Sequence, residues 1–105
     1  MNVKPLSEDE YKSTFSAPMV QLGDDSVPPF DFWNYFDAIP QSDFGDYDCS
    51  DGDIDLVWRD STGRFQHVLI NSQDKNVFMV IVLDAVNAIV YGHRLLDLNK
   101  EYGLK

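Results

Sequence analysis

The sequence predicts an α+β domain in which short helices pack on one face of a four-stranded antiparallel β-meander. The C-terminal half carries four apolar runs of strand length, separated by short turn-forming segments. The N-terminal half instead carries apolar residues at helical spacing and is interrupted by prolines. With 105 residues, the chain is long enough for one hydrophobic core and too short for two. We therefore expect a single domain over residues 1–105.

The first helix is expected to begin after Ser7. Ser7 and Glu10 have the spacing of a capping box, and Leu6 can contact Tyr11 as a hydrophobic staple across the cap. Tyr11 and Phe15 lie four positions apart, so they share one face of the helix. This face can anchor the helix to a core.

Helical spacing returns after a proline-rich connection. Pro18 ends the first helix at the latest, and residues 21–29 have the composition of an exposed loop. Residues 30–36 contain five aromatic side chains, and one helical stripe joins Phe32, Tyr35, Phe36 and Ile39. A second short helix, ended by Pro40, is therefore expected. Its aromatic stripe is typical of core packing, although surplus rings such as Trp33 also suit an interface.

The first two strands are expected after an acidic loop at residues 41–52. The apolar residues that alternate in the first strand are Ile54, Leu56 and Trp58. Residues 60–63 form a turn signal in which Gly63 can adopt a left-handed conformation. Residues 64–71 are then the return strand, so the two strands form a hairpin.

The last two strands complete the predicted meander. Residues 77–83 are apolar at every position, which indicates a strand covered on both faces. Residues 84–87 turn the chain, and residues 88–94 supply the fourth strand. Asp97 can cap a final helical turn that Gly103 closes.

Charge is distributed very unevenly along the chain. Eight Lys and Arg residues oppose 18 Asp and Glu residues, and the net charge is −10. No Lys or Arg occurs between Ser13 and Trp58, where ten aspartates account for the whole imbalance. Such a potential repels nucleic acid and anionic lipid, so neither direct nucleic-acid binding nor membrane binding is expected. It attracts a basic protein partner or a cation, although acidic residues also simply keep proteins soluble.

The acidic segment and the aromatic helix beside it supply the candidate site. Exposed rings next to charged side chains are a composition found at interfaces. The residues expected to bind a partner are Trp33, Tyr35, Asp43, Asp46, Asp48, Asp51, Asp53 and Asp55.

No metal or cofactor site is predicted. Residues 46–55 cluster oxygen ligands as calcium requires, but the spacing excludes an EF-hand, because with Gly52 sixth the twelfth position is Trp58 rather than Glu. An irregular cation site stays open. In a meander, His67 and His93 lie on strands about 9.6 Å apart, which is too far to share a zinc ion.

The sequence contains no recognised catalytic motif, so we expect a protein that is not an enzyme. Cys49 is the only cysteine, which excludes an intrachain disulfide, and the aspartates around it oppose the thiolate that a nucleophile needs. Asp53 and Asp55 would project from one strand face about 7 Å apart, a carboxylate spacing that glycosidases use. An acid/base or metal-dependent hydrolase is therefore a third interpretation.

Two C-terminal segments, Val77–Asp84 and Tyr91–Gly103, resemble short acidic bacterial proteins carried on mobile DNA. These are the integron gene-cassette proteins, mostly of unknown function, and the small immunity proteins that neutralise secreted toxins. The resemblance covers roughly residues 77–104 and contains no catalytic motif. It implies a compact α+β protein that acts by binding, since immunity proteins often oppose basic nucleases with acidic surfaces.

Together these observations predict a non-enzymatic interaction protein whose acidic face binds a cationic partner, and the resemblance implies an immunity or inhibitor protein of a mobile gene cassette. The alternative is a small-ligand binding module with an apolar pocket between the aromatic helix and the sheet. An exposed meander edge makes a homodimer conceivable. The longest apolar run has seven residues and the start has no secretory pattern, so no membrane span and a cytoplasmic location are expected.

Overall fold

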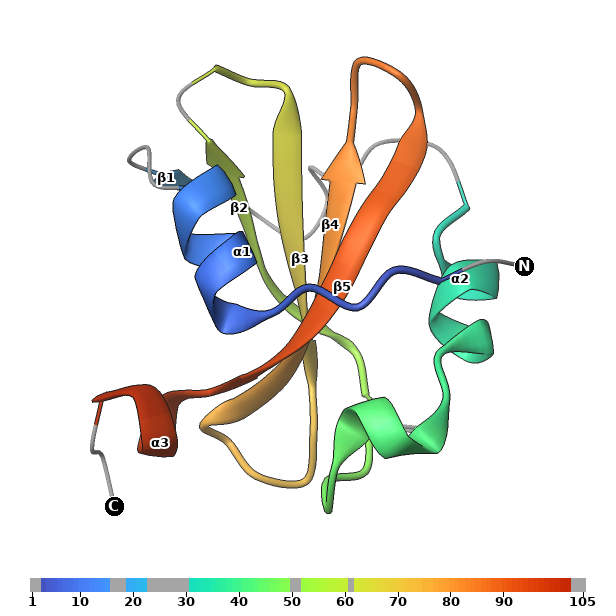
Figure 1. Ribbon diagram of the computed structural model, residues 1–105, viewed down its shortest axis with the longest axis vertical. Helices are drawn as coiled ribbons and strands as arrows, with labels where there is room; N and C mark the ends of the chain where they lie inside the picture. Colours follow the sequence, from blue (N-terminus) through green and yellow to red (C-terminus); the bar gives the residue numbers. More distant parts are fainter. Residues whose placement is uncertain (1–2, 16–18, 23–30, 50–51, 61, 103–105) are drawn as a thin grey trace.

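The computed structural model describes residues 3–15, 19–22, 31–49, 52–60 and 62–102 (Figure 1). In chain order its elements are α1 (Glu8–Thr14), β1 (Met19–Leu22), α2 (Trp33–Ala38), the 3-10 helix η2 (Gln41–Phe44), β2 (Ile54–Asp60), β3 (Phe65–Asn71), β4 (Val77–Asp84), β5 (Ile89–Asp97) and α3 (Leu98–Tyr102). The strands form one antiparallel sheet in the order β1-β2-β3-β4-β5. The α+β fold class and the meander of the four predicted strands, now β2 to β5, are confirmed.

The sheet contains one strand more than the sequence predicts. β1 pairs with β2 so that Met19 lies opposite Asp60 and Leu22 opposite Val57. Part of this strand falls in residues 21–29, which the sequence assigns to a loop. Four residues are too few to display a period of two, so the pairing is decided by the neighbouring strand rather than by a local pattern.

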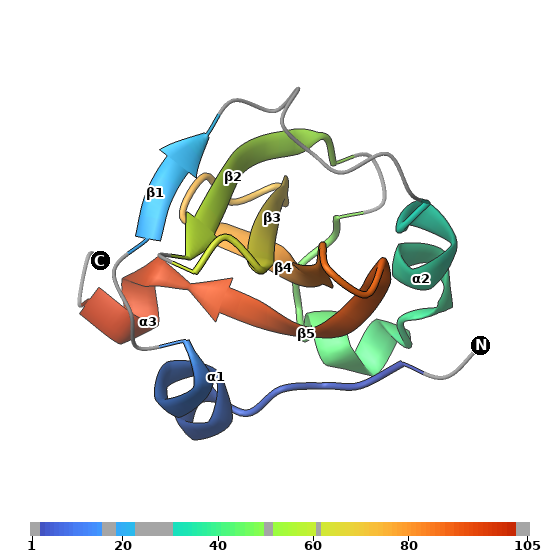
Figure 2. The ribbon, with the colours of Figure 1, turned by 90° about the horizontal axis from the view of Figure 1, so that it is seen from above.

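The helices lie on both faces of the sheet, so the prediction that they cover one face is wrong. α1 and α2 stand apart in the view from above (Figure 2). The α1-face core consists of Leu6, Tyr11, Phe15, Leu69, Phe78, Val80, Val82 and Leu96. The α2-face core consists of Phe32, Tyr35, Phe36, Ile39, Phe44, Cys49, Val57, Val68, Ile70, Met79, Ile81 and Leu83. β4 is apolar on both sides, and its two faces therefore need separate covers.

The two N-terminal helices begin differently. Ser7 caps α1, since its Oγ accepts a hydrogen bond from the Glu10 N–H at 3.0 Å, as the capping-box spacing predicts. The N-cap of α2 is Phe32, which makes no side-chain cap, but the preceding Asp31 accepts from the Trp33 N–H at 2.9 Å. α2 ends at Ala38, two residues before Pro40. The aromatic stripe predicted for this helix is buried, in agreement with the sequence.

A β-bulge interrupts the alternation predicted for β2. The register with β3 shifts between Ile54 and Leu56. Ile54 therefore packs against the α2-face core, whereas Leu56 and Trp58 pack against the α1-face core. The extra residue, Asp55, is exposed. A bulge turns the preceding side chain to the opposite face, so period two holds only on one side of it.

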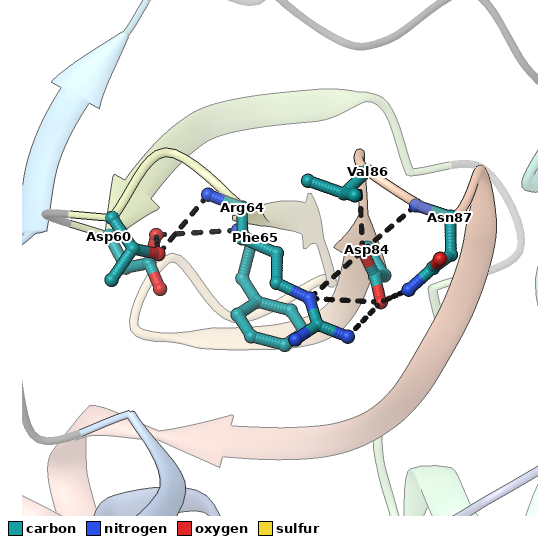
Figure 3. A network of polar contacts seen from close by, with 7 residues as sticks. Asp60, Arg64, Phe65, Asp84, Val86 and Asn87 are labelled. Carbon is teal, nitrogen blue, oxygen red and sulfur yellow. Dashed lines mark hydrogen bonds and ion pairs between the residues drawn. The ribbon is translucent and has the colours of Figure 1, made fainter.

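A polar network joins two turns at one end of the sheet (Figure 3). Arg64 follows the β2–β3 turn, and its guanidinium contacts the buried carboxylate of Asp84 at 3.0 Å. Asp84 also accepts hydrogen bonds from Asn87 Nδ2 and from the backbone N–H of Val86. The hydrogen bonds from Arg64 are the main reason why the pKa of Asp84 falls to about 2. The predicted turn at Gly63 is confirmed, with a left-handed φ of 76°.

The N-terminal segment lies beside β5. Leu6 N–H donates to the His93 carbonyl at 2.7 Å, and His93 N–H donates to the Lys4 carbonyl at 3.0 Å. A Cβ at Gly92 would lie 2.9 Å from both Leu6 and the Lys4 carbonyl, so this approach requires glycine. The outer edge of β5 is therefore covered at this point. Among the described residues, no helix has the length and apolar character needed to cross a membrane.

Candidate acidic docking surface

Two of the predicted partner-binding residues, Tyr35 and Asp43, bond to the buried side chain of His93. Tyr35 is only 5% exposed, and its hydroxyl lies 2.7 Å from His93 Nδ1. His93 Nε2 in turn lies 2.8 Å from Asp43 Oδ2. Tyr35 is therefore not available to a partner, which corrects the prediction for this residue. It belongs to the buried stripe of α2, and that stripe decides its direction.

A chain of hydrogen bonds joins Asp43, His93 and Tyr35. Each donor in this chain faces an acceptor. Lys4 N–H donates to the Tyr35 oxygen at 2.8 Å. Burial raises the pKa of Tyr35, so its hydroxyl keeps its proton and can donate to His93 Nδ1. With Nδ1 accepting, the Nε2–H of His93 donates a hydrogen bond to the Asp43 carboxylate. The sequence gives no local signal for this chain, because its members lie 50 and 58 residues apart.

We use the name acidic strip for five exposed residues: Trp33, Asp37, Asp46, Asp48 and Asp53. Trp33 is 39% exposed, although its ring stacks on Phe32 at 4.8 Å. Asp37 lies four residues later in α2 and therefore on the same helix face. The side chains of Asp37, Asp46, Asp48 and Asp53 are all exposed.

Two adjoining hollows connect three members of the acidic strip, Asp37, Asp48 and Asp53. The first has a volume of about 210 Å³ and is lined by Phe36, Asp37, Ile39, Gln41, Phe44, Asp48 and Cys49. The second has a volume of about 230 Å³ and is lined by Asp48, Gly52, Asp53, Asn71, Ser72 and Gln73. Asp48 belongs to both, and Gln73 donates from Nε2 to the Asp46 carbonyl. The carboxylates that line these hollows therefore come from three segments: Asp37 from α2, Asp48 from the loop after η2, and Asp53 from the residue before β2.

The acidic strip differs in part from the predicted set of residues. Asp46, Asp48, Asp53 and Trp33 belong to both sets, and all four are exposed. Asp55 is exposed in the bulge but lines neither hollow, and Asp51 lies outside the described residues. Asp37 is absent from the predicted set, although its spacing from Trp33 was a usable signal.

Ion pairing distinguishes the acidic strip from α1. On α1, Lys12 pairs with Glu8 at 2.8 Å and Lys4 pairs with Glu10 at 3.4 Å. Within the described part of the chain, no cationic side chain lies within ion-pair distance of Asp37, Asp46 or Asp53. The charge imbalance of the sequence is thus also an imbalance in space.

The remaining candidate groups are Cys49, the two histidines and the pair Asp53 and Asp55. Burial raises the pKa of the Cys49 thiol, which therefore stays protonated at neutral pH. His67 faces the α1 side and His93 the α2 side, so they cannot share a metal ion. No group of three or more metal-ligating side chains occurs among the residues that the structure describes. Asp53 and Asp55, the candidate hydrolase pair, are both exposed, with a bulge between them.

Comparison of the chain with protein-family models, with curated proteins and with solved structures found no match.

Proposed function

We propose that this protein is a non-enzymatic binding protein whose acidic strip docks a basic protein partner. The observation that carries the proposal is the group of exposed carboxylates around two adjoining hollows, without an ion pair for Asp37, Asp46 or Asp53 among the described residues. Segregated charge of this kind steers an oppositely charged protein and fixes its orientation. The half-exposed Trp33 supplies an aromatic contact at one end of the surface.

An immunity or inhibitor role in the cytoplasm of a bacterium is the biological form of this proposal. It is supported by the acidic strip and by the resemblance of residues 77–104 to small acidic proteins of mobile DNA. Basic nucleases are a class of toxin that an acidic surface can oppose, because the same positive charge binds nucleic acid.

The most direct test removes three negative charges from the acidic strip. A control variant removes three negative charges from α1, so the two variants have the same net charge. The test variant combines Asp37→Asn, Asp46→Asn and Asp53→Asn, and the control combines Glu8→Gln, Asp9→Asn and Glu10→Gln. Both raise the formal net charge from −10 to −7. A hexa-arginine peptide serves as the probe, with its dissociation constant measured by calorimetry at low and at high salt.

The test variant should bind the peptide about tenfold more weakly at low salt, and the control should change affinity less than about twofold. High salt should remove most of the difference, since exposed charges are screened. Equal losses in the two variants would contradict the proposal. Salt-insensitive binding of small apolar molecules would favour the alternative of a ligand-binding module.

A further inference from the structure

The two hollows of the acidic strip differ in what lines them. The first hollow, beside α2, has a floor of buried apolar side chains from α2, η2 and the loop that follows: Phe36, Ile39, Phe44 and Cys49. Its remaining lining residues are Asp37, Gln41 and Asp48, all of them exposed. An apolar floor below an acidic rim suits a side chain that is itself apolar along its length and cationic at its tip.

We infer that the hollow beside α2 receives an arginine side chain of the basic partner, an inference that rests on the proposed function. The methylene stem of arginine would cover the apolar floor, and its guanidinium would reach the carboxylate of Asp37 at the rim. Guanidinium is more weakly hydrated than ammonium and can bind the Asp37 carboxylate through two hydrogen bonds, while the stem packs on Phe36 and Phe44, whose rings lie 5.7 Å apart. Arginine is therefore preferred to lysine at this position.

The second hollow provides an internal contrast. Its lining residues are polar apart from Gly52, and none of them is aromatic. A cationic side chain bound there therefore has no ring against which to pack its stem. Dependence of affinity on stem length is thus the property that identifies the hollow beside α2.

Peptides of equal charge test this dependence. Three peptides carry four cationic residues each in the same Gly-Ser background: arginine, lysine, or 2-amino-3-guanidinopropionic acid, which keeps the guanidinium on a shorter stem. The arginine peptide should bind about fivefold more tightly than either of the others, because only arginine combines the stem with the guanidinium. Equal affinity of the short-stem peptide, or of the lysine peptide, would overturn the inference.

Two matched substitutions on η2 test the location without altering charge. Gln41→Phe fills the hollow from its rim, whereas Ser42→Phe places the same ring on an exposed neighbour that lines neither hollow. Gln41→Phe should abolish the preference for the arginine peptide over the short-stem peptide, and Ser42→Phe should keep it. A preference that survives Gln41→Phe would overturn the inference.

The failure of this inference can be distinguished from failure of the proposed function. If neutralising Asp37, Asp46 and Asp53 weakens binding while all three peptides bind alike, the basic partner stands and the arginine hollow is wrong. If neutralisation has no more effect than the α1 control, the proposed function itself is wrong.

Discussion

The two faces of the sheet each contain a buried tyrosine bonded to a buried histidine, and they differ in the third group. On the α1 face, the Tyr11 hydroxyl lies 2.8 Å from His67 Nδ1. On the α2 face, Tyr35 meets His93 in the same way at 2.7 Å, but His93 also bonds to Asp43. His67 Nε2 has no hydrogen-bond partner among the described residues. The Asp43 carboxylate therefore gives His93 a partner at its second ring nitrogen, which His67 lacks among the described residues.

The surroundings of the two histidines explain why they are not equivalent. Phe15 and Tyr11 pack their rings against His67 at 4.7 and 5.3 Å, so the imidazole lies among aromatic groups. Burial lowers the pKa of His67 to about 4, and the charge of Asp60 offsets this only in part. The α2 face instead supplies Asp43 of η2, whose side chain is 26% exposed and whose carboxylate bonds to His93. The same Tyr–His pair thus lies among aromatic rings on one face and joins a carboxylate on the other.

The largest expected effect is loss of stability in acid through His67. Its folded pKa of about 4 is below the unfolded value of 6.5, so the unfolded chain binds the proton first. The contribution is therefore fully present above pH 6.5 and is lost as the pH falls toward 4, by about 3 kcal/mol in all. Urea unfolding of wild type and His67→Gln at pH 7 and pH 4.5 measures it. The variant should lose clearly less stability between these pH values, and an unchanged loss would assign the acid sensitivity elsewhere.

A smaller effect is expected from deleting the two hydroxyl groups. Tyr35→Phe leaves both the Lys4 N–H and His93 Nδ1 without a partner and should cost about 2 kcal/mol. Tyr11→Phe removes the partner of His67 Nδ1 and should cost about 1 kcal/mol. Denaturant unfolding at pH 7 compares the two variants. A larger loss for Tyr11→Phe would reverse the difference between the faces described above.

The smallest effect on stability is expected at Trp33, whose role is proposed to be contact with a partner. Trp33→Ala removes a half-exposed ring from α2 and should cost about 1 kcal/mol or less in unfolding free energy. It should weaken binding of the hexa-arginine peptide by about threefold, since the ring can stack on guanidinium groups. Unchanged binding with a large loss of stability would make Trp33 a core residue.

Local patterns predicted the elements, whereas partners distant in the chain decided the site. The cap at Ser7, the stripe of α2 and the turn at Gly63 are each encoded within a few residues, and the structure contains all three. The bulge at Asp55 has no such local signal. Tyr35 is an exception, because the helical spacing that puts it in the stripe of α2 is a local signal for its burial.

Charge was the part of the site that the sequence predicted best. A segment without Lys or Arg between Ser13 and Trp58 has few intrachain cations nearby, so exposed carboxylates are expected wherever it reaches the surface. The direction of each aspartate still depended on the fold. Asp43 turned inward to His93, while Asp37 joined the surface through its position in α2.

The central claim is that binding is localised to the acidic strip, and residue-resolved NMR tests it most directly. Amide shifts of the ¹⁵N-labelled protein would be followed during titration with hexa-arginine at low salt. Shift changes should concentrate at residues 33–37, 41, 46–48 and 52–53, and they should shrink when salt is raised. Changes centred on α1, or spread evenly over the surface, would show that the aspartates contribute only net charge and would contradict the proposed site.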